Sequence, residues 1–409
     1  MFAFGGRVKK HEHTLSLIIT IGSARVTGSL GSLTKDDSGH ECFEVLYATE
    51  APLVYQEQLD VERFVRSMIS ALLEVAQAVQ SCDAAKNNQT IGLIRCVFSA
   101  PWFVSQTRIV HLKRKKPFLI TDELIHTLAA DEVGLFKKAI AHTNSPYTLV
   151  AKNNRVIDTH VVQSSINGYP AQEPNGKTGQ ALSLHLYLSS VSEAILTKIS
   201  DVLTRSFPID EHNIDFTTST LVAYLGVTEH LETGDQYLLI EINGEVTDAT
   251  IIDKGVPIDS VSFPLGTNTI IRSVHEATKT SPEDIRAKLS LLLKARAERS
   301  GEAVSEFERN VFEAVTEWRE ALYRALEKVA KGRPVPQTAL LLLDQSWERL
   351  FLTALKGQPF ELFTFSDRPF SVLPLFSGSL ATKVKSANTG IVYPLGALTG
   401  LMHNKLEAR

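Results

Sequence analysis

The chain has 409 residues, 44% of them hydrophobic and 22% charged, which is ordinary for a soluble globular protein and excludes fibrous and disordered classes. A chain of this length is expected to form about two domains. Its net charge of -4 provides no overall positive field, so we expect no nucleic-acid partner.

Cysteine usage and hydropathy predict the compartment. The three cysteines are Cys42, Cys82 and Cys96, an odd number without metal-ligand spacing, which is typical of reduced thiols in the cytosol. No apolar run reaches the length of a membrane span, and the amino terminus lacks a signal-peptide pattern. We therefore expect a cytoplasmic protein that meets a membrane only through partners or a surface patch.

The first hundred residues predict a layer of strands with one helix. Apolar runs separated by turn residues are typical of strands, whereas Phe64, Met68 and Leu72 recur at helical spacing. This order suits an α/β layer. The expected strands are 15–21, 26–30, 43–48 and 91–99, and the expected helix is 59–80.

The next segment carries a basic run, Lys113, Arg114, Lys115 and Lys116. A nucleic-acid platform would interleave aromatic residues with these cations, so we interpret the run as a solvated strand end. Thr121 is an N-cap for a following helix. The other expected elements are strands 156–166 and 182–188, turns 167–170 and 174–179, and helices 191–203 and 215–227.

The second half alternates apolar strand patterns with helix starts. Gly266 opens one helix and Ser281 caps another, while the last helix closes the chain. The expected strands are 237–242, 249–252, 256–263, 338–343 and 360–365, and the long helices are 307–331, a helix ending at 355, and 391–402.

Two hairpins of the same plan recur, at 15–30 and 237–252. Each has a strand, a turn that contains Gly and a returning strand, and Asn243-Gly244 is the strongest short hairpin signal in the chain. Turn amides can bind phosphate oxygens and a neighbouring Asp can hold a metal through water, although an ordinary hairpin has the same pattern. Two such halves around a cleft are the plan of actin-like nucleotide-binding folds.

Both hairpins resemble phosphate motifs of the actin-like proteins that include the bacterial cell-division protein FtsA and the pilus-platform protein PilM. The family's first motif is Asp-hydrophobic-Gly-Ser-Ser, then a basic or polar residue and Val. Its second motif is Asp-hydrophobic-Gly-Gly-Gly-Thr-Thr-Asp. The corresponding segments here are Thr20-Ile-Gly22-Ser23-Ala24-Arg25-Val26 and Glu241-Ile-Asn243-Gly244-Glu245-Val246-Thr247-Asp248.

Later segments follow in the family's order, so the resemblance runs nearly end to end. They are Pro264-Leu-Gly266-Thr-Asn268, Ser281-Pro-Glu-Asp-Ile-Arg-Ala-Lys288 and Pro394-Leu-Gly396-Ala-Leu-Thr-Gly400-Leu. The resemblance implies an α/β, two-lobed, actin-like (duplicated ribonuclease H-like) fold with a small inserted SHS2-type subdomain. The implied bounds are 1–108 and 180–228 for the first lobe, 109–179 for the insert, 229–390 for the second lobe, and 391–409 for the closing helix and carboxyl terminus.

Three departures from the family's motifs predict a degenerate nucleotide site. Thr20 replaces an Asp that would position metal and water, and Glu245 adds negative charge where phosphate oxygens would lie. The Gly-rich adenosine-side motif is replaced by side chains that crowd the site, among them Trp347. The positions assigned to the degenerate site are Thr20, Gly22, Ser23, Glu241, Asn243, Gly244, Glu245, Thr247, Asp248, Asp344, Gln345 and Ser346.

The expectation is therefore a site without catalytic residues, metal or resident cofactor, with ATP and Mg²⁺ binding as the alternative. Thr247 and Asp248 are then expected to bond turn amides, and Glu241 to pair with a neighbouring base.

The favoured function is an FtsA-like scaffold of bacterial cell division at the inner face of the cell membrane. Its expected partners are proteins of a membrane machine, and it is expected to self-associate. The first alternative is a PilM-like platform component of type IV pili, favoured by the termini: residues 1–10 resemble the PilM opening, and the chain ends just past the closing helix. The second is an active ATPase or phosphotransferase, and the third is an unrelated α/β protein.

Overall fold

The computed structural model describes residues 15–407 except for short internal stretches. Those stretches are 37–38, 87–89, 142–152, 232–233, 296–304, 331–332, 357–369, 376–382 and 387–392. The strand predicted at 360–365, the basic lead at 1–10 and the start of the helix predicted at 391 lie outside the described residues.

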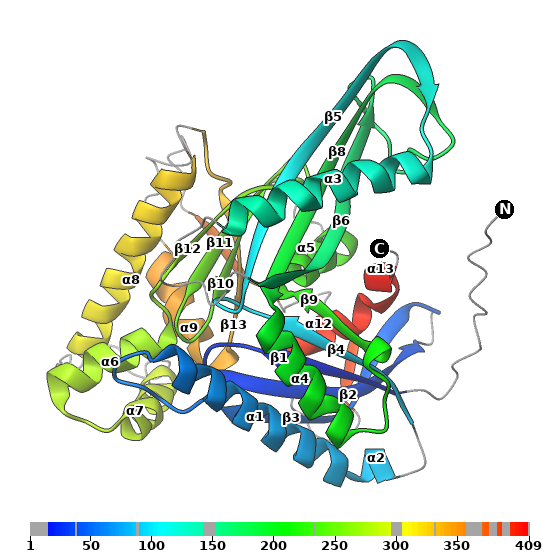
Figure 1. Ribbon diagram of the computed structural model, residues 1–409. Helices are drawn as coiled ribbons and strands as arrows, with labels where there is room; N and C mark the ends of the chain where they lie inside the picture. The colour runs from blue at the N-terminus through cyan, green and yellow to red at the C-terminus, as the bar shows by residue number, and fades with distance from the viewer. Residues whose placement is uncertain are drawn as a thin grey trace.

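The first lobe is built on a six-stranded sheet of order β15-β3-β2-β1-β4-β9 (Figure 1). β1 pairs antiparallel with β2 and parallel with β4, so a meander is followed by parallel strands. The strands predicted at 15–21, 26–30, 43–48 and 91–99 are confirmed. The bounds are β1 Leu15–Ile21, β2 Arg25–Lys35, β3 Glu41–Pro52, β4 Ile91–Phe98, β9 Ile214–Thr218 and β15 Val384–Ser386.

The second lobe repeats this arrangement in a separate five-stranded sheet of order β12-β11-β10-β13-β14. β10 pairs antiparallel with β11 and parallel with β13, as β1 does with β2 and β4. The predicted duplicated two-lobed fold is therefore confirmed. The bounds are β10 Tyr237–Ile242, β11 Thr247–Asp253, β12 Val256–Phe263, β13 Thr338–Leu343 and β14 Ser371–Pro374.

A third, four-stranded sheet of order β5-β8-β6-β7 projects from the body, with one long helix, α3, along it (Figure 1). The buried side chains Phe136 of α3 and Leu184 and Leu186 of β8 belong to one apolar cluster, so α3 covers one face of this sheet. The segment expected as an insert, 109–179, lies within this unit. The bounds are β5 Phe103–Leu119, α3 Asp122–Ala141, β6 Asn154–Ile166, β7 Tyr169–Pro170 and β8 Thr178–Ser192.

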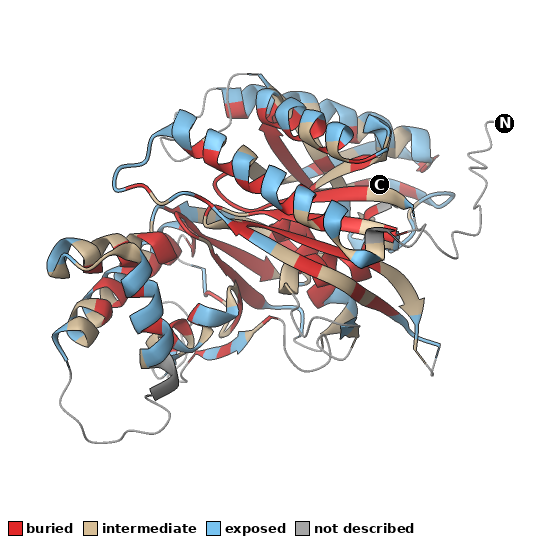
Figure 2. Ribbon diagram, turned by 90° about the horizontal axis from the view of Figure 1, so that it is seen from below, coloured by how far each residue is buried: buried red, intermediate tan, exposed pale blue. Residues whose placement is uncertain are grey.

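Helices cover the sheets, with their buried faces turned inward and their exposed faces outward (Figure 2). The caps predicted from sequence form: the Thr121 hydroxyl accepts from the Leu124 amide at 3.2 Å, and the Ser281 hydroxyl accepts from the Asp284 amide at 3.1 Å. The bounds are α1 Val61–Ser81, α2 Asp83–Lys86, α4 Glu193–Ser206, η1 Glu211–Asn213, α5 Ser219–His230, α6 Thr267–Thr278, α7 Pro282–Ala295, α8 Glu306–Ala330, α9 Gln345–Leu355, α12 Pro394–Leu401 and α13 His403–Glu407.

Two helix predictions were wrong at their starts. Residues 215–218, predicted as helix, form most of β9, because Phe216 and two threonines pair with β4 and β-branched residues suit a strand. Residues 191 and 192, also predicted as helix, end β8, which is longer than the predicted 182–188. The last helix begins at Pro394, whose missing amide suits the first helical position.

One apolar cluster joins the lobes. Ile18 and Val97 of the first sheet and Leu239 and Leu340 of the second belong to it, together with Leu398 of α12 and residues of α5. The lobes therefore share buried side chains behind the cleft. No helix in the described part of the chain has the length and hydropathy needed to span a bilayer.

Candidate functional site

A cavity of about 310 Å³ lies between the lobes, where the predicted phosphate turns meet. Thr20 and Arg25 come from the first hairpin, and Glu241 and Asn243 from the second. Asp344, at the start of α9, and Tyr393, before α12, complete the wall. The structure thus brings most of the predicted site positions to one place.

The two turns touch each other directly. The Glu245 amide donates to the Ser23 hydroxyl at 2.9 Å, and both residues are buried. A Cβ on Gly244 would lie 2.8 Å from the Ala24 nitrogen, closer than real Cβ contacts come. Gly244 is therefore needed for close approach of the two turns.

One backbone amide of each turn bonds to a carbonyl within the same turn. Asn243 N donates to Val246 O at 3.0 Å, and Gly22 N donates to Arg25 O at 3.0 Å. At the start of α6, Thr267 N bonds Asn243 O and Asn268 N bonds Gly244 O. These amides, with that of Glu245, are already satisfied without a phosphate.

The first hairpin ends in a pair of hydroxyls. Thr20 and Thr27 face each other in the register of β1 and β2, and their hydroxyl oxygens are hydrogen-bonded. Both side chains are buried. This corner carries no charge.

The second hairpin ends in a pair of carboxyls, Glu241 and Asp248, at the corresponding register positions. Burial raises the pKa of Glu241, against the effect of bonds from Ser219, Ser99 and Asn243. The Ser219 hydroxyl donates to Glu241 Oε2 at 2.5 Å. Among the described residues no base pairs with Glu241, so the predicted ion pair was wrong.

Asp248 lies behind the cavity rather than in its wall. Burial, followed by the charge of Glu241, raises the pKa of Asp248 to about 7, while a bond with Ser262 lowers it. Its Oδ1 atom is buried and has no hydrogen-bond partner among the described residues. The expected bond to a turn amide is therefore not the role of this oxygen.

Thr247 serves the second-lobe core. Its hydroxyl donates to the Leu265 carbonyl at 2.7 Å and accepts from Trp318 Nε1 at 2.9 Å. The predicted bond to a turn amide was wrong, because a carbonyl and an indole N–H take up the hydroxyl.

Glu245 does not line the cavity. Asn268 Nδ2 donates to its Oε1 at 2.9 Å, and Arg272 of α6 forms an ion pair with its carboxylate. The predicted repulsion of phosphate by Glu245 was therefore wrong, because a guanidinium that comes 27 residues later in the chain balances this charge.

Asp344 caps α9 and also lines the cavity. Its Oδ1 accepts from the Ser346 amide at 2.7 Å and from the Ser346 hydroxyl at 2.7 Å. Its other oxygen forms an ion pair with Arg25, whose guanidinium also donates to Glu50 at 2.6 Å. Gln345 lines the cavity beside Asp344.

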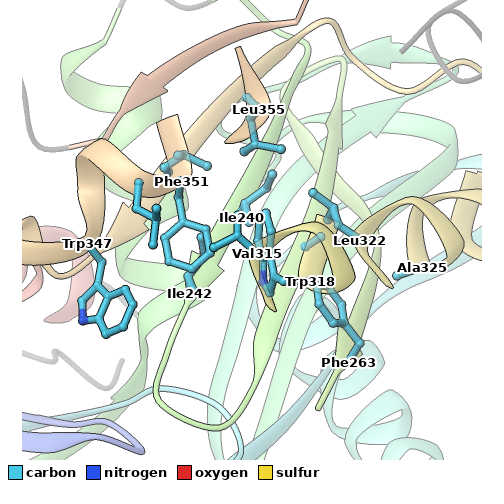
Figure 3. Packing of buried hydrophobic residues seen from close by; sticks show 14 of the residues in the cluster. Ile240, Ile242, Phe263, Val315, Trp318, Leu322, Ala325, Trp347, Phe351 and Leu355 are labelled. Carbon is cyan, nitrogen blue, oxygen red and sulfur yellow. The ribbon is translucent and has the colours of Figure 1, made fainter. Parts of the chain in front are cut away.

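Trp347 lines the cavity and also packs into the second-lobe core (Figure 3). Its ring centroid lies 6.3 Å from that of Phe351, which in turn meets Trp318 edge-on at 4.6 Å. Only 8% of Trp347 is exposed. The indole is thus a fixed part of the cavity wall. It lies where the sequence predicted that side chains replace the family's Gly-rich motif.

Sequence reasoning missed several members of the site, among them Ser219, Arg272 and Tyr393. These three residues lie outside both hairpins, and none was assigned to the site. Only the position of Arg272 one turn after Asn268 on α6 could have indicated its role. Within the described residues, no group of three or more His, Cys, Asp and Glu side chains is arranged to hold a metal ion.

Comparison with known proteins supports an actin-like fold. No family model matches the chain, and no curated protein matches it in sequence. Among solved structures, a PilM-PilN type IV pilus biogenesis complex aligns over 97% of this chain and 98% of that one, with a TM-score of 0.57 and 10% identity.

Two more distant structures align over most of their length. A MamK double helical filament gives a TM-score of 0.43 at 10% identity, covering 95% of this chain and 99% of that one. The ethanolamine utilization protein EutJ from Carboxydothermus hydrogenoformans gives 0.42 at 10% identity, covering 94% and 89%.

Proposed function

We propose that this chain is an actin-like scaffold that binds partner proteins and does not hydrolyse ATP. The observation that carries this proposal is the direct contact between the two turns, in which Ser23 accepts the Glu245 amide. A triphosphate with Mg²⁺ needs free turn amides and carboxylates that face the phosphates. Here the amides of Gly22, Asn243 and Glu245 bond to protein oxygens, and Thr20 stands in the place of one carboxylate.

The other residues of the cavity wall do not fit a triphosphate with Mg²⁺ either. Glu241 is the carboxyl that lines the cavity beside the turns; burial raises its pKa, and its Oε2 atom already accepts a bond from the Ser219 hydroxyl. Arg25 is held by Asp344 and Glu50 rather than free to bind a phosphate. These contacts support a site that has become structural.

The partner is inferred from the neighbouring structure. The PilM-PilN complex gives a TM-score above 0.5, and its alignment spans nearly both chains. This likeness favours a PilM-like platform at the inner face of a membrane over an FtsA-like division scaffold. An active ATPase stays as the alternative function, and self-association stays as a prediction.

The test of the nucleotide site is titration calorimetry with ATP and Mg²⁺, together with phosphate release by the purified chain. We expect binding weaker than about 1 mM and no turnover. Micromolar binding, or turnover that Glu241→Gln abolishes, would refute the scaffold proposal and favour the ATPase. Gln345→Ala is a control that alters the same wall without touching a carboxyl.

The test of the partner class is affinity purification from the native cells with the tagged chain. Recovery of pilus-assembly proteins supports the PilM-like role, whereas recovery of division proteins supports the FtsA-like one.

A further inference from the structure

The projecting third sheet has two edges, and they differ in how well they are protected. Edge strands expose unpaired amides and carbonyls, and proteins usually blunt them with short strands, Pro, Lys or bulges. The β7 edge has only two residues and ends in Pro170. The β5 edge is 17 residues long.

The outer part of β5 is protected. Between Lys113 and Phe118 the strand advances five residues while β8 advances two, so β5 bulges there. The bulge contains Pro117, which has no amide hydrogen, and three lysines or arginines, which are exposed. Strand addition is disfavoured along this part.

The inner part of β5 is regular and open. Residues 108–112, here called the open edge, pair with β8 without interruption, and no described strand pairs with their other side. β12 approaches β5 at residues 105–107, where the two strands line a hollow of about 330 Å³. The open edge is about 16 Å long, which suits a strand of ordinary length.

Apolar side chains lie beside the open edge. Ile109 is 50% exposed. Arg108 bonds Glu132 of α3 at 2.7 Å, and Leu135, one turn further along α3, is 48% exposed. An added strand could therefore cover apolar surface as well as bond the backbone.

The charge next to the open edge specifies the occupant. Lys113, Lys115 and Lys116 are exposed and form no ion pair with any described residue. Arg114 is likewise exposed and stacks on Phe118 at 4.7 Å. Four cations at the end of an open strand complement carboxylates on a segment that pairs with it.

We propose that the open edge of β5 binds an extended, acidic segment of a partner protein by strand addition. This inference deepens the proposed scaffold function, because it names where a partner binds and with what chemistry. It does not depend on the nucleotide site, so ATP binding would refute the scaffold proposal and leave this one standing.

The experiment uses fluorescent ten-residue peptides of alternating Thr and Val with three glutamates at one end, placed at either terminus to allow both strand directions. We expect one of them to bind the full chain with a dissociation constant of about 10–100 µM. Two N-methylated versions of this peptide are then compared, one with methyl groups on the odd-numbered amides and one with them on the even-numbered amides. Strand addition predicts that one version loses binding and the other retains it.

The matched variants reverse equal numbers of exposed lysines. Lys113→Glu with Lys115→Glu and Lys116→Glu should weaken binding about tenfold or more. The control, Lys198→Glu with Lys328→Glu and Lys356→Glu, makes the same change in net charge on other surfaces and should leave binding unchanged. Circular dichroism confirms that both variants fold, and the N-methylation comparison needs no variant.

Several outcomes would refute the proposal. The first is no peptide binding at about 1 mM. The second and third are equal binding by the two N-methylated peptides and an equal loss of binding in the two triple variants. The last two are binding of phosphatidylserine vesicles that the peptide does not compete with, and a dimer of the chain that Ile109→Lys dissociates.

Discussion

The two hairpins at the cleft have the same strand pairing but opposite chemistry at matching positions. The first places Thr20 opposite Thr27, two hydroxyls that satisfy each other. The second places Glu241 opposite Asp248, two buried carboxyls with raised pKa values. Duplication fixed the backbone of both, whereas each lobe has its own means of stabilising the buried polar groups.

The difference shows where the second lobe is vulnerable. Hydroxyl pairs are neutral, so the first corner is insensitive to pH. The stability of the second corner depends on the protonation of its carboxyls. The turn beside it depends on the ion pair of Arg272 with Glu245. Substitutions that leave a charge unpaired beside the second hairpin should therefore cost more stability than matched ones at the first, whereas neutralising a carboxyl there should stabilise the protein at high pH.

The largest effect is expected for Arg272→Ala. It leaves the buried Glu245 carboxylate without its cation and should destabilise the protein by about 3–5 kcal/mol in denaturant unfolding. Adding Glu245→Gln should recover much of this loss, because no unpaired charge is then buried. Arg205→Ala, which removes a guanidinium that is 82% exposed, should change little. Equal effects of the two arginine variants would contradict the inferred burial cost.

The next effect depends on pH and separates the two corners. The folded-state pKa of Asp248 is about 7 against an ordinary 3.8, so the folded protein keeps a proton that the unfolded chain releases first. Stability from this group is full below pH 4 and falls until about pH 7, by about 2–4 kcal/mol. Asp248→Asn should remove that fall and be more stable than the parent at pH 8.

Unfolding of Asp248→Asn and Thr20→Val at pH 4.5 and pH 8 checks this expectation. Thr20→Val should lower the stability by about 1 kcal/mol at either pH, since the pair of hydroxyls contains no group that titrates in this range. A pH-independent difference between Asp248→Asn and the parent would show that Asp248 is ionised throughout.

The smallest effect concerns the glycines of the two turns. Gly244→Ala should cost about 1–3 kcal/mol, because its Cβ would meet the Ala24 backbone at 2.8 Å. Gly22→Ala should cost less, since the nearest atom, Arg25 O, lies at 3.2 Å. Gly134→Ala on α3 has open space and should stabilise by about 0.5–1 kcal/mol. Thermal unfolding of the three variants measures the order; the reverse order would contradict the close approach of the turns.

The sequence predicted the repeated elements because they are local. Apolar runs such as 15–21 and 237–242 and helix caps such as Thr121 depend on neighbouring residues. β9 was missed because its five residues run directly into α5, so their short alternation is hidden beside a helical pattern, and only pairing with β4 makes them a strand.

The chemistry of the site was predicted less well, since it depends on residues distant in sequence. Thr20 and Glu241 were placed at the cleft correctly because the repeat fixes their positions. The effect of Glu245 was misjudged because its cation comes from α6, and the partners of Thr247 come from a loop and from α8. Such pairings follow from tertiary packing rather than from local pattern.

The helix α12 has a mechanical consequence. A Cβ on Gly400 would lie 2.4 Å from the Phe43 ring, and one on Gly226 would lie 2.4 Å from Leu398, so α12 sits tightly against both β3 and α5. Swinging the lobes apart would expose the apolar cluster shared behind the cleft, at about 25 cal/mol for each Å². This cost resists rotation of one lobe against the other. Proteins bound to the two lobes would therefore be held at a constant spacing and orientation.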